Sequence, residues 1–242
     1  MNVCLNLSGK IILGDNETLL DKINHFKKYI NFDKIYMHIW ADDYIKYFNE
    51  IQFIKNCSVI VVTPPIIDEN YYFPHFLKIK TPYEYKAHSN VFQFYGLQCV
   101  FQQSCLEDND IHIRCRYDNI LYKHLNIEDI TPYLDCPNPV AIAPYGSDWH
   151  HGLGDVFYIL NRSAAQCMKS YFYDVVEMCK SNVPFHPESL LRNHFVNDNK
   201  FKLYRMSYPV TINGSQHYFQ ECFLNNLIVE DKLYFISEFF PK

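Results

Sequence analysis

The sequence predicts an α/β fold in which helices flank a mainly parallel central sheet, followed by a smaller β-containing C-terminal part. Short apolar runs typical of buried strands alternate with stretches of helical periodicity through the first two-thirds of the chain. The 242 residues are 48% hydrophobic and 20% charged, which is enough to bury a core without disulfides. We therefore expect one domain over residues 1–242.

The strands are expected where short runs are rich in apolar or β-branched residues and end at turn residues. Residues 58–63, for example, are stopped by Pro64 and Pro65. In residues 111–116 polar and apolar side chains alternate, so that His112, Arg114 and Arg116 share one face of that strand. The expected strands cover residues 3–7, 34–40, 58–63, 111–116, 140–143 and 156–160.

The helices are expected where apolar residues recur every three or four positions. In the first, Leu19 and Phe26 fall on one face, and Asp15 or Asn16 is placed to cap its N-terminus. The last begins at Pro187, because proline is favoured at the first helical position. The expected helices cover residues 18–30, 43–48, 89–106, 163–179 and 187–197, and β structure is expected over 201–212 and 233–239.

Composition excludes several classes of protein. A net charge of −5 argues against a nucleic-acid binder, and the seven glycines form no phosphate-binding loop motif. No apolar run approaches the length of a transmembrane helix, and the N-terminus lacks the features of a signal peptide. The nine cysteines have no metal-site or disulfide spacing. We expect reduced thiols in a soluble cytoplasmic protein, in the host cytoplasm if its source is a virus.

Two strand ends carry residues suited to chemistry, since parallel sheets bind ligands at the carboxyl ends of their strands. The first strand ends in Ser8 and Gly9, which let backbone amides approach a ligand closely. The strand with Arg114 and Arg116 is followed by Asp118. Arginine suits phosphate oxygens and a carboxylate suits a divalent cation. An edge strand with a solvated face, or an internal Arg–Asp network, explains the same spacing.

A glycine-rich loop over residues 146–155 is a further candidate site, because it gathers titratable groups between two strands. Glu188 stands in the first turn of a helix, where the helix dipole alone can account for a carboxylate. The titratable residues of the loop are Asp148, His150, His151 and Asp155.

Six motifs occur in a familiar order: LSGK at 7–10, DKIYMHIW at 33–40, SNVFQFY at 89–95, RCRYD at 114–118, GDVF at 154–157 and PE at 187–188. In this order, over roughly residues 1–200, the chain resembles the WavE-type and the capsular or lipopolysaccharide-biosynthesis glycosyltransferases of the Rossmann-like GT-A fold. It departs from them at Lys10, where Ile11 follows instead of arginine, and in having a single Asp118 instead of a doubled aspartate.

The resemblance implies a metal-dependent glycosyltransferase. Its donor would be a UDP- or GDP-sugar, and its acceptor a glycan hydroxyl in polysaccharide or glycoprotein glycan synthesis. Residues 1–130 would bind the nucleotide sugar, and residues 131–242 the acceptor. Asp118 would hold Mn²⁺ or Mg²⁺ on the diphosphate, and Asp155 or Glu188 would be the general base of an inverting reaction. The other implied contacts are Ser8, Gly9, Arg114 and Arg116 to the nucleotide sugar, and Asp148, His150 and His151 to the acceptor.

Other functions fit parts of the sequence. The HHGLGD segment resembles the HHxxxD motif of CoA-dependent acyltransferases, in which His151 would be the general base and Asp155 the motif's aspartate. The many aromatic residues suit a non-catalytic glycan-binding module. A metal-dependent hydrolase built on His150, His151 and Asp155 is a third alternative.

Overall fold

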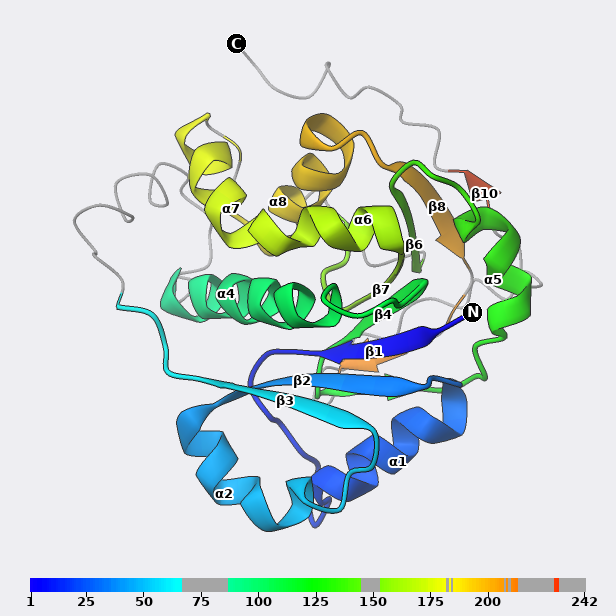
Figure 1. The fold of residues 1–242 in the computed structure, drawn as a ribbon. Helices are drawn as coiled ribbons and strands as arrows, with labels where there is room; N and C mark the ends of the chain where they lie inside the picture. The colour runs from blue at the N-terminus through cyan, green and yellow to red at the C-terminus, as the bar shows by residue number, and fades with distance from the viewer. Residues whose placement is uncertain are drawn as a thin grey trace.

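The computed structural model describes residues 1–66, 87–144, 153–181, 183, 185–206, 208, 210–212 and 229–230. A central sheet lies between two layers of helices (Figure 1). Within the described residues its strand order is β10-β8-β6-β7-β4-β1-β2-β3. The strands are β1 Val3–Leu7, β2 Lys34–Trp40, β3 Cys57–Val62, β4 Ile111–Cys115, β6 Val140–Pro144, β7 Phe157–Asn161, β8 Lys202–Met206 and β10 Val229–Glu230.

The sheet is mainly parallel, as predicted. Strands β3, β2, β1 and β4 run parallel to one another, and β6 runs parallel to β8. Strand β7 is antiparallel to both β4 and β6, and β10 is antiparallel to β8. Strands from both halves of the chain therefore join in one sheet. The predicted division into a nucleotide-sugar half and an acceptor half stays a prediction.

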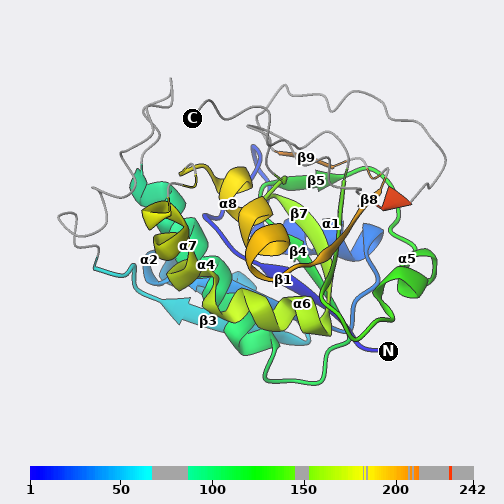
Figure 2. The same ribbon diagram turned by 90° about the horizontal axis from the view of Figure 1, so that it is seen from above.

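Each face of the sheet has its own hydrophobic core. Helices α1, α2 and α5 cover one face, and α4, α6 and α7 cover the other (Figures 1 and 2). None of the helices in the described ranges has both the length and the apolar character that a membrane crossing requires. The helical segments are α1 Leu19–Tyr29, α2 Ala41–Ile51, α4 Ala87–Ser104, α5 Ile127–Leu134, α6 Arg162–Cys167, η2 Met168–Ser170, α7 Tyr171–Lys180, α8 Pro187–Asn193 and η3 His194–Asp198.

Strand β4 is central, so the expectation of a solvated edge is wrong. It lies between β1 and β7, and all five of its residues are buried. Its alternation is confirmed: Ile111, Ile113 and Cys115 pack in the core on the α1 side. His112 and Arg114 therefore point to the face covered by α4, where the His112 ring lies 6.0 Å from that of Phe101.

Three local predictions need correction. Thr18 caps α1, not Asp15 or Asn16: its hydroxyl accepts from the Asp21 amide at 3.0 Å, and Asp21 Oδ2 accepts from the Thr18 amide at 3.0 Å. The helix expected over 163–179 is divided by the 3₁₀ turn η2, at which the Ser170 hydroxyl donates to the Cys167 carbonyl at 3.3 Å. The helix expected over 187–197 turns π-helical in η3.

The sequence also missed some elements. Helix α5 contains Pro132, and the three-residue strand β5 (Asn119–Leu121) pairs with β9 (Val210–Ile212) in a second small sheet. The β structure predicted over 201–212 appears as β8 and β9, whereas residues 233–239 lie outside the described residues. The C-terminal part therefore contributes to both sheets.

Helix α4 packs on the sheet at a glycine. A Cβ atom added to Gly96 would lie 2.7 Å from Cε1 and 2.8 Å from Nδ1 of the His38 ring, which is fully buried in β2. The absence of a side chain at position 96 is what lets the helix approach the strand so closely.

We expect Gly96→Ala to lower the free energy of unfolding by about 1–3 kcal/mol, because the new methyl group overpacks the contact with His38. Helix propensity alone predicts a change of the opposite sign, a gain of about 1 kcal/mol. Urea unfolding of the two proteins measures the difference. A more stable Gly96→Ala protein would show that the contact is looser than described.

Candidate active site at the carboxyl ends of β1 and β4

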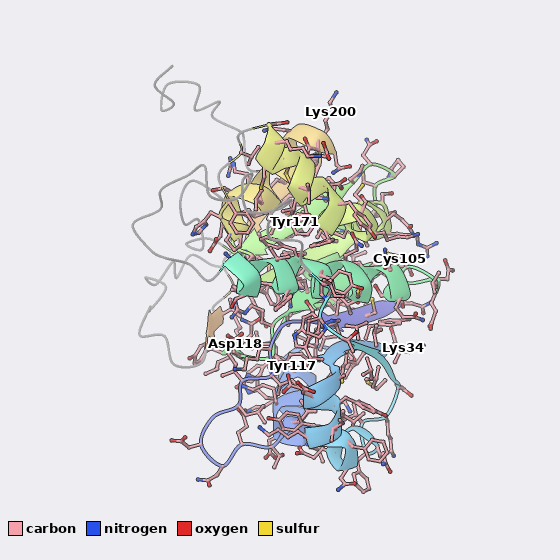
Figure 3. All side chains as sticks on the ribbon, turned by 90° about the vertical axis from the view of Figure 1, so that its left-hand side faces the viewer. Lys34, Cys105, Tyr117, Asp118, Tyr171 and Lys200 are labelled. Atoms are coloured by element: carbon pink, nitrogen blue, oxygen red, sulfur yellow. The ribbon has the colours of Figure 1, made fainter. Side chains whose placement is uncertain are left out.

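The candidate site lies where β1 and β4 end side by side. Leu7 and Cys115 are register partners, so the residues that follow them, Ser8 and Arg116, emerge at the same edge of the sheet. Asp118 marks this edge in Figure 3, and Lys34, at the start of β2, marks the opposite end. The carboxyl edge of the parallel strands is where ligands bind in open α/β sheets.

The first turn at this edge, Ser8-Gly9, has a backbone that glycine favours. Gly9 has φ of +112°, and a Cβ added there would meet no atom within 4 Å, so there is open space beside it. Ser8 is fully buried, and its hydroxyl has no hydrogen-bond partner among the described residues. Both features fit the predicted close approach of a ligand to this turn.

Arg116 and Asp118 form a bidentate ion pair. Arg116 Nε donates to Asp118 Oδ1 at 2.9 Å, and its terminal Nη2 donates to Asp118 Oδ2 at 2.7 Å. The Arg116 backbone amide also donates to Asn119 Oδ1 at 2.8 Å, which holds the turn after β4. The side chain of Asp118 is almost fully buried, whereas a quarter of the Arg116 side chain is exposed. The sequence alternative of an internal Arg–Asp network is therefore correct for Arg116.

Arg114 differs from Arg116 although it stands only two residues away on the same face. Its side chain is completely buried, and its three side-chain nitrogens make no well-aligned hydrogen bond in the part of the chain that the structure describes. Burial lowers the pKa of its guanidinium. Its register partner in β7 is the buried Tyr158, whose hydroxyl interacts with the Arg114 side chain without the geometry of a well-aligned hydrogen bond.

Asp155 and Glu188 complete the cluster of charges. Asp155 Oδ2 accepts a hydrogen bond from Gln93 Nε2 on α4, and its charge acts on Arg114 and Arg116. Glu188 opens α8, and its Oε2 lies 2.6 Å from His186 Nδ1. Burial raises the pKa of Glu188, and the neighbouring charge of Asp155 raises it further. The backbone amide of residue 153 donates to the Glu188 carbonyl at 2.9 Å, joining the two segments.

The structure brings most of the predicted site residues to one end of the sheet. Ser8 and Gly9 follow β1, and the four charged groups of Arg114, Arg116, Asp155 and Glu188 act on one another beside them. Asp118 belongs to the same group through Arg116. The predicted acceptor residues Asp148, His150 and His151 lie outside the described residues.

Sequence reasoning missed three contributors to the site. Gln93, Asn119 and Tyr158 were not predicted there, although Gln93 and Asn119 stand in or beside quoted motifs. The alternation of residues 156–160 gives a signal for Tyr158, because it indicates which side chains share a face of β7. It gives no signal for the pairing of β7 with β4, which places Tyr158 opposite Arg114.

The described residues give the predicted metal no support. Each oxygen of Asp118 accepts one hydrogen bond from Arg116, so the charge of the carboxylate is already paired with a guanidinium. Within the described ranges, no three His, Cys, Asp or Glu side chains gather in a way that could hold a metal ion. The metal role of Asp118 stays a prediction.

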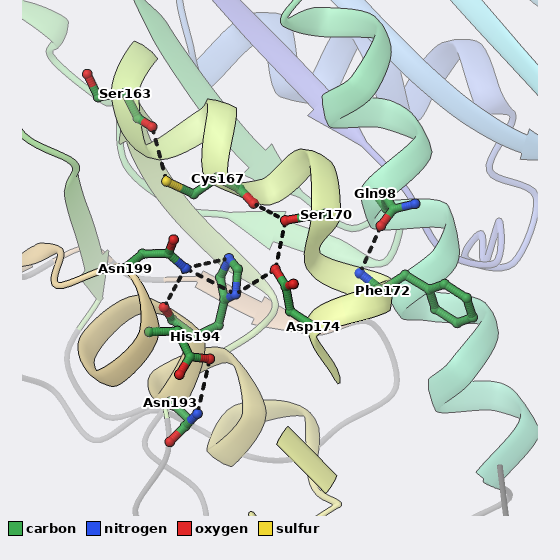
Figure 4. A network of polar contacts seen from close by, with 10 residues as sticks. Gln98, Ser163, Cys167, Ser170, Phe172, Asp174, Asn193, His194 and Asn199 are labelled. Atoms are coloured by element: carbon green, nitrogen blue, oxygen red, sulfur yellow. Dashed lines mark hydrogen bonds and ion pairs between the residues drawn. The ribbon is translucent and has the colours of Figure 1, made fainter. Parts of the chain in front are cut away.

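A second polar network lies away from this edge and is structural (Figure 4). The Ser170 hydroxyl donates to Asp174 Oδ2 at 2.7 Å, and the same oxygen lies 3.5 Å from Nδ1 of the buried His194. Asn199 Nδ2 donates to the His194 carbonyl at 2.9 Å. These contacts connect α7 to the π-helical segment η3 and satisfy polar groups on the side of the sheet that α4, α6 and α7 cover.

Comparisons with known proteins give little beyond the fold. No family model matches the chain, and no curated protein sequence matches it. Among solved structures, the apo form of mouse xyloside xylosyltransferase 1 matches with a TM-score of 0.46 and 11% identity, over 84% of each chain. A likeness at this level transfers no residue role or substrate. The layered α/β architecture is consistent with the predicted GT-A-like class, whereas membership of the WavE-type family stays a prediction.

Proposed function

We propose that this protein is a glycosyltransferase that moves a sugar from a UDP- or GDP-sugar to a glycan hydroxyl. The observation that carries the proposal is the meeting of two arginines and two carboxylates, Arg114, Arg116, Asp155 and Glu188, at the carboxyl edge of the sheet. Sugar transfer needs positive charge for the departing diphosphate, and its inverting form also needs a base for the attacking hydroxyl. This cluster supplies both kinds of group.

Glu188 is the better candidate for the base. Burial and the charge of Asp155 raise its pKa, which brings a carboxylate closer to the range in which it accepts a proton from a hydroxyl efficiently. Asp155 accepts from Gln93 and acts on both arginines, so it suits a positioning role. The acceptor hydroxyl would give its proton to Glu188 as its oxygen attacks the anomeric carbon of the donor sugar.

Metal dependence is a separate part of the expectation. A divalent cation bound at Asp118 would supply further charge to the diphosphate, but that carboxylate already pairs with the Arg116 side chain. The steps proposed here therefore use only the side chains of the chain itself. Activity assays with Mn²⁺, with Mg²⁺ and with EDTA separate the two cases.

We expect Glu188→Gln to lower the rate of sugar transfer about 100-fold or more, because the amide cannot accept a proton. Release of UDP or GDP from a panel of nucleotide sugars, with and without glycan acceptors, measures the rate. Glu177→Gln is the matched control, since Glu177 is exposed on α7 and pairs with Lys180. Glu188→Gln with the activity of the unaltered protein would show that the base lies elsewhere, and no release from any donor would contradict the proposed function.

No observation in the structure favours the alternatives. His150 and His151, on which the acyltransferase and hydrolase depend, lie outside the described residues. A non-catalytic glycan-binding module would bind glycans in the same assay without releasing UDP or GDP from any donor.

A further inference from the structure

A row of unsatisfied polar groups crosses the sheet beneath α4. It extends over the neighbouring strands β2, β1, β4 and β7. Buried polar atoms normally have partners, and a native protein leaves only a few without one per hundred residues. The buried side-chain atoms without a well-aligned hydrogen bond in this part of the described structure are Asn6 Oδ1, Ser8 Oγ, both ring nitrogens of His38, all three nitrogens of Arg114 and the Tyr158 hydroxyl. Arg114 and the Tyr158 hydroxyl interact with each other, but not with that geometry.

Arg114 is the most costly member of this row. Removing a guanidinium from water costs several kcal/mol unless good hydrogen bonds replace the lost hydration. The other arginines of this region have such bonds: Arg116 has both oxygens of Asp118, and Arg162 has Asp110 and the Asn109 carbonyl. Arg114 is completely buried, and within the described residues it has only a poorly aligned contact with the neutral Tyr158 hydroxyl. An arrangement of this kind is typical of a site that a ligand completes.

The charges around Arg114 leave its donors unused. Asp118 is held by Arg116, and Glu188 is in contact with His186. Asp155 acts on Arg114 through space, but its Oδ2 accepts from Gln93, and it makes no hydrogen bond to the guanidinium. The five N–H groups of the Arg114 side chain match the geometry of an oxyanion. The Tyr158 hydroxyl interacts with the guanidinium, and Ser8 adds a buried hydroxyl at the end of β1.

We propose that Arg114 is the anchor of a phosphate-binding site that takes a phosphoryl oxygen of the donor diphosphate, and that this binding needs no divalent cation. The inference rests on the proposed function and deepens it. Gly9 lies at the same end of the sheet, directly after Ser8, and a Cβ added to it would meet no atom within 4 Å. The guanidinium fork, rather than a metal at Asp118, then provides the charge that faces the diphosphate.

The test measures stability and binding with the full chain in EDTA. UDP, GDP and inorganic phosphate are each added at increasing concentration, and the rise in Tm is recorded by thermal unfolding. The unaltered protein is compared with Arg114→Met, Arg114→Lys, Arg116→Met and, as the control for binding, Arg162→Met, whose arginine contacts Asp108 and Asp110.

The proposal expects two results together. Without ligand, Arg114→Met raises Tm by about 2 °C or more, because an apolar side chain replaces an unsatisfied buried charge, whereas Arg116→Met lowers Tm. The ligand-induced rise in Tm seen for the unaltered protein and for Arg162→Met disappears in Arg114→Met. Arg114→Lys keeps the positive charge but loses the planar guanidinium. The affinity for the probe that binds the unaltered protein therefore falls at least about tenfold, while the fold is kept.

Three results overturn the proposal. The first is a lower Tm for Arg114→Met than for the unaltered protein without ligand. The second is the same ligand-induced rise in Tm in these two proteins, and the third is no rise in the Tm of the unaltered protein with any of the three probes in EDTA. A rise with UDP or GDP but not with inorganic phosphate supports a nucleotide ligand, and an equal rise with inorganic phosphate supports a site for free phosphate. Lost transfer in Arg114→Met with unchanged binding refutes this inference alone. Phosphate binding through Arg114 without any sugar transfer refutes the proposed function alone.

Discussion

Arg116→Met is expected to lower the free energy of unfolding by about 3–5 kcal/mol. The change removes both hydrogen bonds from Asp118, whose side chain is only 3% exposed, and so leaves an uncompensated buried carboxylate. Urea unfolding at pH 7 measures the loss.

The double variant Arg116→Met with Asp118→Leu is the control for this result. Removing both partners leaves no buried charge, so most of the lost stability should return, and the difference between the single and double variants measures the coupling. A loss below about 1 kcal/mol in Arg116→Met would mean that Asp118 finds water or another donor. It would also reopen Asp118 as a ligand for a cation.

Acidification is expected to destabilise the protein through three buried histidines. Burial and, second to it, the charge of Arg114 lower the pKa of His38 to about 4. Burial likewise lowers the pKa of His112 and that of His194 to about 4. In the unfolded chain all three titrate near the usual value of about 6.5, so unfolding takes up protons below that pH. The stability that the neutral rings provide is present above pH 6.5 and is lost as the pH falls toward 4.

Each histidine adds up to about 1.4 kcal/mol per pH unit in this window, so the three together give a slope of about 4 kcal/mol per pH unit at most. Urea unfolding between pH 6.5 and 5 measures the slope, which the raised pKa values of Glu188, Asp174 and Asp198 oppose. His112→Gln should lower the slope by about 1.4 kcal/mol per pH unit, and replacing the exposed His124 by Gln should not change it. A flat profile would contradict the prediction.

Local periodicity predicted most of the sheet correctly. The strands over 3–7 and 34–40 have the predicted bounds, because short apolar runs between turn residues identify a buried strand by themselves. Strand β5 and its partner β9 have only three residues each, too few for periodicity to be recognised. Their pairing joins segments about ninety residues apart, which no local pattern encodes. Pro132 hid α5, because proline disfavours the interior of a helix.

The sequence by itself determined that Arg114 and Arg116 share one face of a strand and that Asp118 follows them, because side chains two apart in a strand point the same way. Only the tertiary structure decided which arginine is paired. The turn after β4 bends Asp118 back to Arg116, whereas Arg114 lies within β4, between β1 and β7, and is buried away from water. Burial and hydrogen bonding depend on neighbours distant in the chain, so two residues of one type on one face can have opposite environments.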